Sequence, residues 1–234
     1  MAEVIVALDV ATGAEALRLT DRLGSLADFY KIGLELYTRE GPSVVSDLRS
    51  RDKRVFLDLK LHDIPNTVAG AVAGASELGV QLLTVHAAGG RAMLEVAREA
   101  AGGGLRLLAV TVLTSLEAAD LCGVWGREVS SVRDEVSRLT SIARGAGVDG
   151  VVAAASDAAR IRAEAGGDFL IVVPGIRPRG SDRDDQRRVA TPAEAVCAGA
   201  DYLVVGRAVT RAPDPAAALA AVLTEVEEAA PRGT

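Results

Sequence analysis

The segment FLDLKLHDIPNT, which begins at Phe56, contains three charged residues at spacings that suit acid–base chemistry. Asp58 and Lys60 are two residues apart, so on a β-strand both side chains point to one face. Asp63 follows just past the expected strand end. Because nearby carboxylates favour a charged lysine, Lys60 is expected to be a proton donor and not a Schiff-base amine, which must be neutral to attack. The alternative is a buried structural ion pair, but buried charges are costly and cluster at functional sites.

Two further charged residues lie near the ends of other apolar runs. Lys31 belongs to the run FYKIG, and Asp9 ends the run VIVALD. If these runs are neighbouring strands, they add a second ammonium group and a second carboxylate beside Asp58 and Lys60. So dense a charge array is difficult to explain as core packing, and we interpret it as a candidate catalytic site.

A second candidate region lies late in the chain, where glycines and arginines follow apolar runs. The segments VVPGIRPRG and YLVVGRAV bring Arg177, Gly206 and Arg207 to the ends of the last two expected strands, the usual phosphate site of an α/β barrel. Backbone N–H groups and guanidinium groups both bind phosphate oxygens. The polar segment at about 177–190 is either a solvated loop or a lid over a ligand, and its position favours a lid.

Eight short apolar runs, separated by helical patterns, predict the fold. Near-continuous apolar character is typical of parallel strands that are buried on both faces. The runs cover residues 3–9, 28–33, 54–60, 81–87, 105–112, 149–154, 169–175 and 201–206. Eight such units in 234 residues predict an α/β protein, a (β/α)8 TIM barrel that forms a single domain over residues 1–234. An open doubly wound sheet is the alternative, but it usually has about five or six strands.

Helix signals occupy the intervening segments. Thr12 and Thr191 each precede a glutamate by three residues, the capping-box pattern, and Pro192 suits a first helical turn. Functional groups of such barrels lie at the carboxyl ends of the strands. Reading those ends in order gives Asp9, Lys31, Asp58, Lys60, His86, Thr114, Pro174, Gly175, Gly206 and Arg207.

Composition narrows the function classes. The chain is 49% hydrophobic and 25% charged with a net charge of −6, which argues against a nucleic-acid or anionic-membrane surface. Cys122 and Cys197 are too few for a disulfide framework and lack metal-ligand spacing. The first residues resemble a strand and not a signal peptide, and no apolar run approaches the roughly 20 residues of a membrane span. We therefore expect a cytoplasmic protein.

These motifs together resemble the orotidine 5′-monophosphate decarboxylase family. DLKLHDIPNT is similar to the family signature D-x-K-x-x-D-I-x-x-T. VALD, YKIG, VTVLTS, PGIRP, a glutamine in the lid and VVGRAV follow in the family's order, so the resemblance extends from Asp9 to Arg207. It implies cofactor-free, metal-free removal of CO2 from orotidylate to make UMP, the final step of de novo pyrimidine nucleotide synthesis.

The resemblance also implies roles at the reacting end. Lys60 matches the residue that protonates C6 of the pyrimidine, and Asp58 matches the carboxylate that faces the leaving CO2. Lys31 and Asp9 match residues that hold the ribose hydroxyls and complete the charge network. Asp63 matches an aspartate that a homodimer partner contributes to the opposite site.

Further residues match the family's substrate contacts. Thr67 lies beside Asp63 at the implied dimer interface. The resemblance assigns Thr114 and Ser115 to the pyrimidine and the lid. It assigns phosphate binding to Arg177, Gln186, Gly206 and Arg207. The expected partners are thus a small nucleotide substrate and a second copy of the chain, without nucleic acid or membrane.

Two alternatives differ in class. The first is a related sugar-phosphate decarboxylase or hexulose-phosphate synthase that uses Mg²⁺. Those enzymes carry a metal-binding glutamate near the end of the second strand, where this chain has Lys31, which would repel a divalent cation. The second is a non-catalytic phosphate-ligand binder, which would not require the charge density of Asp58, Lys60 and Asp63.

Overall fold

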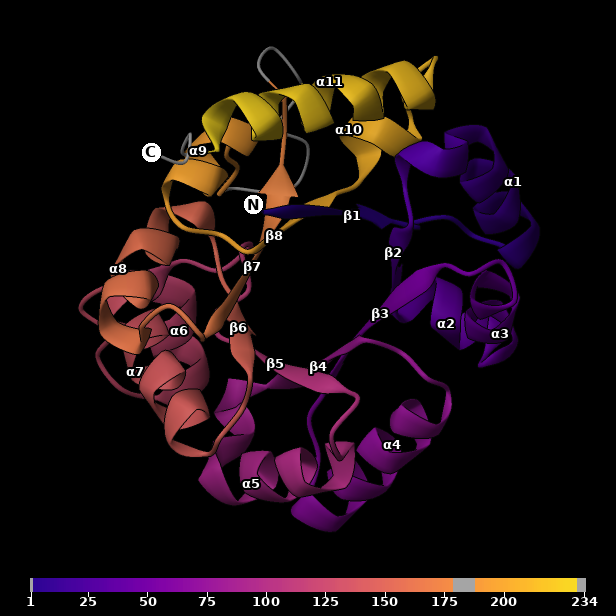
Figure 1. Cartoon of the computed structure of the whole chain (residues 1–234). Coiled ribbons are helices and arrows are strands. Elements are labelled where there is room, and N and C mark those ends of the chain that lie inside the picture. The colour runs from indigo at the N-terminus through magenta and orange to yellow at the C-terminus, as the bar shows by residue number, and fades with distance from the viewer. Residues whose placement is uncertain (1, 179–187, 231–234) are drawn as a thin grey trace.

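The eight apolar runs form eight parallel strands that close into a barrel, in the order β1 to β8 around the ring (Figure 1). The fold prediction is therefore confirmed. The strands are β1 (Glu3–Ala7), β2 (Phe29–Gly33), β3 (Arg54–Leu61), β4 (Leu82–His86), β5 (Arg106–Val110), β6 (Gly150–Val152), β7 (Leu170–Ile176) and β8 (Tyr202–Val205). The computed structural model describes residues 2–178 and 188–230, so most of the predicted lid lies outside the described residues.

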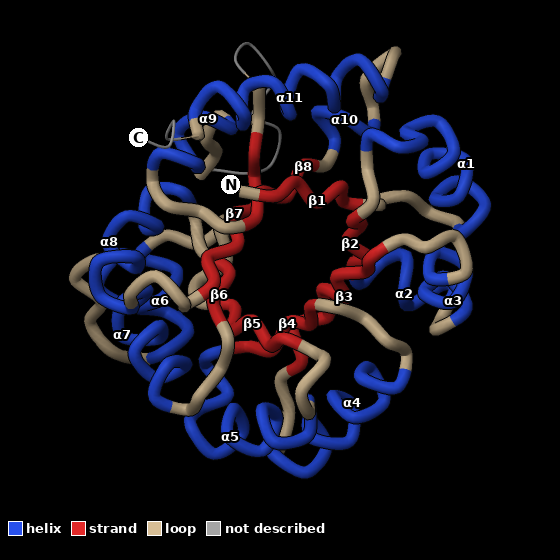
Figure 2. Tube along the Cα trace, viewed as in Figure 1, coloured by secondary structure: helices blue, strands red, loops and turns tan. Residues whose placement is uncertain are grey.

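Helices surround the barrel on its outer side (Figure 2). They are α1 (Gly13–Leu23), α2 (Leu34–Glu40), α3 (Ser43–Arg49), α4 (Pro65–Glu77), α5 (Gly90–Ala101), α6 (Ala118–Trp125), α7 (Val132–Gly145), α8 (Ala155–Ala165), α9 (Pro192–Cys197), α10 (Arg207–Thr210) and α11 (Pro215–Ala229). Capping boxes begin α1 at Thr12 and α9 at Thr191, as predicted. No helix among the described residues is long and apolar enough to cross a membrane.

Alternation along the strands divides the core into two buried clusters. The larger one packs the strands against the helices. The smaller one fills the inside of the barrel with Ile5, Ala7, Phe29, Phe56, Leu82, Leu108, Val172 and Val204. Successive side chains of a strand point to opposite faces, so the residue two positions after each of these also points inward. Asp9, Lys31 and Asp58 follow members of this cluster at that spacing, and they therefore form the next layer toward the carboxyl ends.

The barrel ladder is irregular at two places. Between β3 and β4 the register shifts between Leu57 and Leu61, and between β7 and β8 it shifts between Val173 and Ile176. Both shifts occur toward the carboxyl ends of their strands. An extra residue in a strand bends it and re-aims its side chains, and such irregularities occur at barrel rims beside active sites.

Candidate active site

A cavity of about 200 Å³ opens at the carboxyl end of the barrel. Its floor contains apolar side chains of the inner barrel layer, including Phe56 and Val204. Its walls carry the charged and polar groups predicted from the strand ends. Those that line it are Asp9, Lys31, Asp58, Lys60, Thr114, Arg177, Gly206 and Arg207. A concave site in which polar groups converge above an apolar floor is a usual form of a small-molecule site.

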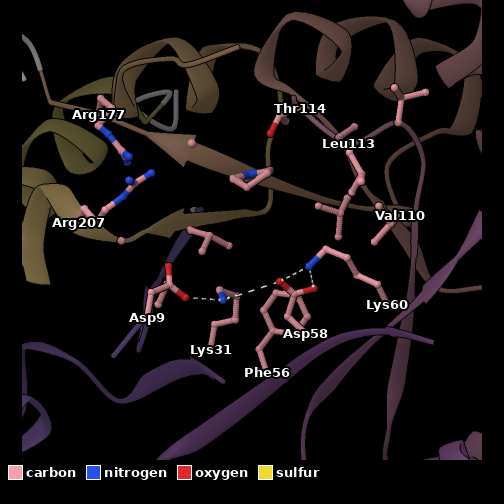
Figure 3. A pocket seen from close by; sticks show the side chains of 18 residues that line it. Asp9, Lys31, Phe56, Asp58, Lys60, Val110, Leu113, Thr114, Arg177 and Arg207 are labelled. Carbon is pink, nitrogen blue, oxygen red and sulfur yellow. Dashed lines mark hydrogen bonds and ion pairs between the residues drawn. The ribbon is translucent and has the colours of Figure 1, made fainter. Parts of the chain in front are cut away.

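Four charged residues alternate in sign along one side of this cavity (Figure 3). Lys31 Nζ lies 3.0 Å from Asp9 Oδ1 and 3.7 Å from Asp58 Oδ2. Lys60 Nζ donates to both oxygens of Asp58, at 2.9 Å each. Gly33 leaves space for this array, because a Cβ atom there would lie 2.9 Å from Lys31 Nζ. We call Asp9, Lys31, Asp58 and Lys60 the charge array.

Asp58 is the centre of the charge array, with only 15% of its side chain exposed. Burial by itself would raise the pKa of this carboxyl group. The charges of Lys31 and Lys60 and the hydrogen bonds from Lys60 and Thr84 outweigh burial, so the pKa of Asp58 lies below its ordinary value. Asp58 is thus a buried carboxylate that stays ionised beside two ammonium groups.

The backbone of Lys60 has an unusual conformation. Its φ angle is +51°, in the left-handed region that non-glycine residues rarely adopt. The N–H of Lys60 donates to Thr84 Oγ1 at 2.8 Å, within the stretch where the register between β3 and β4 is irregular. Residues held in such conformations cluster at functional sites, where the surrounding structure fixes them.

Two arginines occupy the other side of the cavity. The guanidinium groups of Arg177 and Arg207 reach toward each other from the β7 and β8 sides, away from Asp58 and Lys60 (Figure 3). Arg177 is only 6% exposed, and its Nη1 donates to its neighbour's carbonyl oxygen, that of Ile176, at 3.0 Å. The cavity is therefore bipolar: one side alternates in charge and the other is cationic, which suits an elongated ligand with an anionic end.

Comparisons with known proteins identify relatives of the whole chain. A profile of the Orotidine 5'-phosphate decarboxylase / HUMPS family matches residues 2–222. The chain belongs to this family. It is 50% identical over 228 residues to an orotidine 5'-phosphate decarboxylase of Sodalis glossinidius, covering 96% of this chain and 90% of the relative. The corresponding protein of Moorella thermoacetica is 51% identical over 233 residues, covering 96% of this chain and 92% of the relative.

Solved structures agree with this assignment. The crystal structure of the orotidine 5'-phosphate decarboxylase from Lactobacillus acidophilus superposes with a TM-score of 0.86 at 36% identity, covering 97% of this chain and 99% of that chain. A solved structure that bears the family's name therefore has the same fold as this chain.

Not every predicted residue of this family member lines the cavity. Asp63 and Thr67 lie beyond β3, exposed, with Asp63 beside a separate shallow hollow next to Pro65. Ser115 is exposed next to Thr114, outside the cavity lining. Gln186 lies outside the described residues. Within residues 2–178 and 188–230, no cluster of three or more His, Cys, Asp or Glu residues could hold a metal ion.

Sequence reasoning missed two polar residues of this region. Thr84 is fully buried and donates to Asp58 Oδ1 at 2.9 Å. The signal for it was a hydroxyl group in the apolar run LLTVH, two residues after the inward-pointing Leu82. Arg188 contacts the wall of the cavity from outside through the carbonyl oxygens of Val112 and Leu113. No local pattern distinguished Arg188 from the other arginines of its segment.

Proposed function

We propose that this chain decarboxylates orotidine 5′-monophosphate to UMP and CO2, the last step of de novo pyrimidine nucleotide synthesis. The observation that carries the proposal is the bipolar cavity, with the charge array on one side and Arg177 and Arg207 on the other. This arrangement matches a substrate with a reacting carboxylate at one end and a phosphate at the other. The names of the relatives from Sodalis glossinidius and Moorella thermoacetica support the same reaction.

The proposed chemistry centres on Lys60. When the bond between C6 and the carboxylate breaks, CO2 departs and the electron pair stays on C6, where the pyrimidine has no adjacent electron sink. A fixed ammonium group stabilises that developing negative charge, and it can then deliver a proton to C6. We assign both tasks to Lys60 Nζ, which donates to both oxygens of Asp58.

Asp58 has two roles in this proposal. It fixes the direction of Lys60, because the ammonium group donates to both carboxylate oxygens. Its own negative charge would face the substrate carboxylate, and the resulting repulsion ends when CO2 leaves as a neutral molecule. Lys31 and Asp9 continue the charge array from Asp58. We assign these two residues to the ribose hydroxyls.

The use of lysine supports a proton-transfer role. The chain has only three lysines, at 31, 53 and 60, although it has 26 lysine and arginine residues together. Two of the three lysines lie in the cavity. Arginine cannot give up its proton in a protein, whereas lysine can act as an acid or a base. The charge array therefore uses lysine, which, unlike arginine, is able to supply a proton to C6.

The phosphate end supplies binding energy far from the reacting bond. We assign the phosphate to Arg177, Gly206, Arg207 and Gln186, and the pyrimidine to Thr114 and Ser115. Interactions with remote parts of a substrate can drive closure and orientation at the reacting centre. Under this assignment the segment at about 177–190 is a lid that excludes water.

We further propose a homodimer in which each chain contributes Asp63 and Thr67 to the partner's site. Asp63 lies outside its own cavity and accepts a hydrogen bond from the N–H of Ile64 at 2.6 Å. Ile64, the next residue in the chain, is a large apolar residue that is 67% exposed. An exposed apolar residue next to a carboxylate that does not line its own cavity supports a shared interface.

A turnover assay tests the proposal against its rivals. We expect purified protein to convert orotidylate to UMP with release of CO2, and to keep its activity after treatment with EDTA. Strong loss with EDTA would favour the Mg²⁺-dependent relatives. Binding of UMP or orotidylate without turnover would favour a non-catalytic phosphate-ligand binder.

A further inference from the structure

The irregular part of β3 lies opposite a single residue of β4. Leu57 pairs with Leu83 and Leu61 pairs with Val85. Residues 58, 59 and 60 of β3 therefore lie opposite one residue of β4, which is Thr84. The chain places both catalytic candidates of β3 inside this irregular stretch.

A bulge of this kind leaves backbone groups without ladder partners, and a buried N–H without a partner is costly. For the Lys60 N–H, the Thr84 hydroxyl is the hydrogen-bond acceptor in place of a backbone carbonyl group. Its oxygen accepts the Lys60 N–H at 2.8 Å, and it lies 2.9 Å from Asp58 Oδ1. A hydroxyl has one proton, and a carboxylate can only accept. The orientation of the hydroxyl group is therefore determined. Its oxygen accepts the hydrogen bond from the Lys60 N–H, and its proton is donated to Asp58 Oδ1.

We propose that Thr84 is a positioning residue of the reaction, which holds the Lys60 backbone and the Asp58 carboxylate in register with each other through one hydroxyl group. The proposal deepens the proposed function and rests on it. Thr84 does not line the cavity, so it acts through the other two residues and not on the substrate.

The environment of Thr84 supports a specific role for its hydroxyl. The side chain is fully buried on the inner face of β4, the same face as Leu82 of the inner cluster. A valine would fill the same space without the polar group. It would leave the part-buried Lys60 N–H without its hydroxyl acceptor. It would also remove the neutral donor from Asp58, whose carboxylate would then be held by the two lysines alone.

The decisive variant is Thr84→Val, with Thr84→Ser as the conservative partner. We expect Thr84→Val to lower kcat about ten- to hundredfold with little change in KM, the loss typical of a hydrogen bond to a charged group. Thr84→Ser, which keeps the hydroxyl, should recover most of the rate. The matched control is Thr140→Val in α7: Thr140 is 2% exposed, and its hydroxyl has no hydrogen-bond partner among the described residues. This control should keep the parent rate.

Two measurements separate positioning from mere packing. The hydrogen bond to Asp58 favours its ionised form, so Thr84→Val should raise the pKa of Asp58 and move the acid limb of the kcat profile to higher pH. The second measurement is amide hydrogen exchange, in which Lys60 should lose protection in Thr84→Val and keep it in Thr84→Ser. The proposal would be overturned if Thr84→Val lowered the rate and the thermal stability but changed neither the pH profile nor the protection of the Lys60 amide. A rate within twofold of the parent would also overturn it.

The exchange measurement does not depend on catalysis. If the parent protein fails to decarboxylate orotidylate, the proposed function is wrong. Retained Lys60 protection in Thr84→Val rejects the positioning role whether or not the parent is active. Should Thr84→Val fail to fold, Thr84→Ala is measured instead, and full activity in that variant rejects the proposal.

Discussion

Arg188 and Asp157 form an ion pair that connects two segments beside the cavity. Arg188 Nη1 lies 2.9 Å from Asp157 Oδ2, and Arg188 Nη2 donates to the carbonyl oxygens of Val112 and Leu113 at 3.2 and 3.3 Å. The Asp157 side chain is only 5% exposed. One arginine thus fixes the first turn of α8 to the segment that precedes Thr114, although Arg188 itself belongs to the connection between β7 and α9.

Removing Arg188 should destabilise the protein in a pH-dependent way. Arg188→Ala would leave the buried Asp157 carboxylate without its partner, which costs about 3 kcal/mol in the free energy of unfolding. Burial already raises the pKa of Asp157 against the opposing charges of Arg188, Arg133 and Arg160. A raised folded pKa gives stability that is present at low pH and is lost as pH rises.

The difference in unfolding free energy between Arg188→Ala and the parent should therefore be larger at pH 7 than at pH 5. Urea denaturation at one protein concentration measures it. Arg188→Ala with Asp157→Ala should be more stable than Arg188→Ala alone, because no buried charge is then left unpaired. This account would be contradicted if the difference between Arg188→Ala and the parent did not change with pH and the double variant were no more stable than Arg188→Ala.

Lys60→Ala should abolish decarboxylation in a protein that stays folded, because no other ammonium group is held by both oxygens of Asp58. Lys60→Arg should also be inactive, since arginine keeps the charge but cannot deliver the proton. Lys53→Ala is the matched control, because Lys53 is the one lysine outside the cavity. Steady-state turnover and circular dichroism measure rate and folding, and near-parent turnover by Lys60→Ala would remove Lys60 from the mechanism.

Arg207→Ala should act mainly on ligand binding and raise KM much more than it changes the intrinsic chemistry. The reason is distance: Arg207 lies across the cavity from Asp58 and Lys60. Orotidine without its phosphate should react poorly with the parent enzyme and lose little more in the variant. Arg211→Ala, an exposed arginine in the same region, is the control. If Arg207→Ala reduced the reaction of both substrates equally, Arg207 would not belong to the phosphate site.

Mixing two inactive proteins tests the shared dimer site. After subunit exchange, Lys60→Ala and Asp63→Ala chains should form heterodimers with one doubly damaged site and one intact site, so activity should return toward half per heterodimer. A mixture of Lys60→Ala with Asp58→Ala is the control. Lys60 and Asp58 lie 2.9 Å apart in one chain, so every site of that mixture keeps a lesion. Proven exchange without recovery in the first mixture would mean that Asp63 serves its own chain.

The buried Tyr30 should limit the stability of the fold at alkaline pH. Burial is the main cause that raises the pKa of Tyr30 from 10.0 to about 12. Below pH 10 this stability contribution is complete, and it is lost as pH rises from 10 to about 12, because the unfolded chain ionises first. Tyr30→Phe should reduce the loss of unfolding free energy over this range, measured by urea denaturation at pH 9 and pH 11. Equal losses in parent and variant would exclude Tyr30 as the cause.

The strands were predictable because burial on both faces leaves a strong pattern. Each of the eight apolar runs contains one strand of the barrel, within a few residues at its ends. The capping threonines Thr12 and Thr191 were equally clear, because a side chain that caps its own helix is a local interaction. The charge array followed from the fold, since polar residues at the ends of parallel strands must meet at one end of the barrel.

What the sequence did not reveal depends on backbone irregularity and on long-range contacts. No residue type in LDLKL announces that Lys60 has a positive φ angle, because that conformation arises from pairing with β4. Thr84 gained its importance from the same pairing. The contact between Arg188 and Asp157 joins residues 31 positions apart, and nothing near either residue signals it. The dimer roles of Asp63 and Thr67 stay predictions.

The bulge in β3 changes the height of Lys60 in the barrel. With an uninterrupted ladder, Asp58 would pair with Thr84, and Lys60 would lie level with His86. That is two residues, or about 7 Å, farther along the strand. The bulge instead keeps Lys60 level with Thr84, so that its ammonium group contacts the Asp58 carboxylate. A designer who transplanted only the side chains of the charge array onto an idealised barrel would therefore lift Lys60 off its target, so a faithful copy would have to include the irregular stretch of β3 and the threonine opposite it.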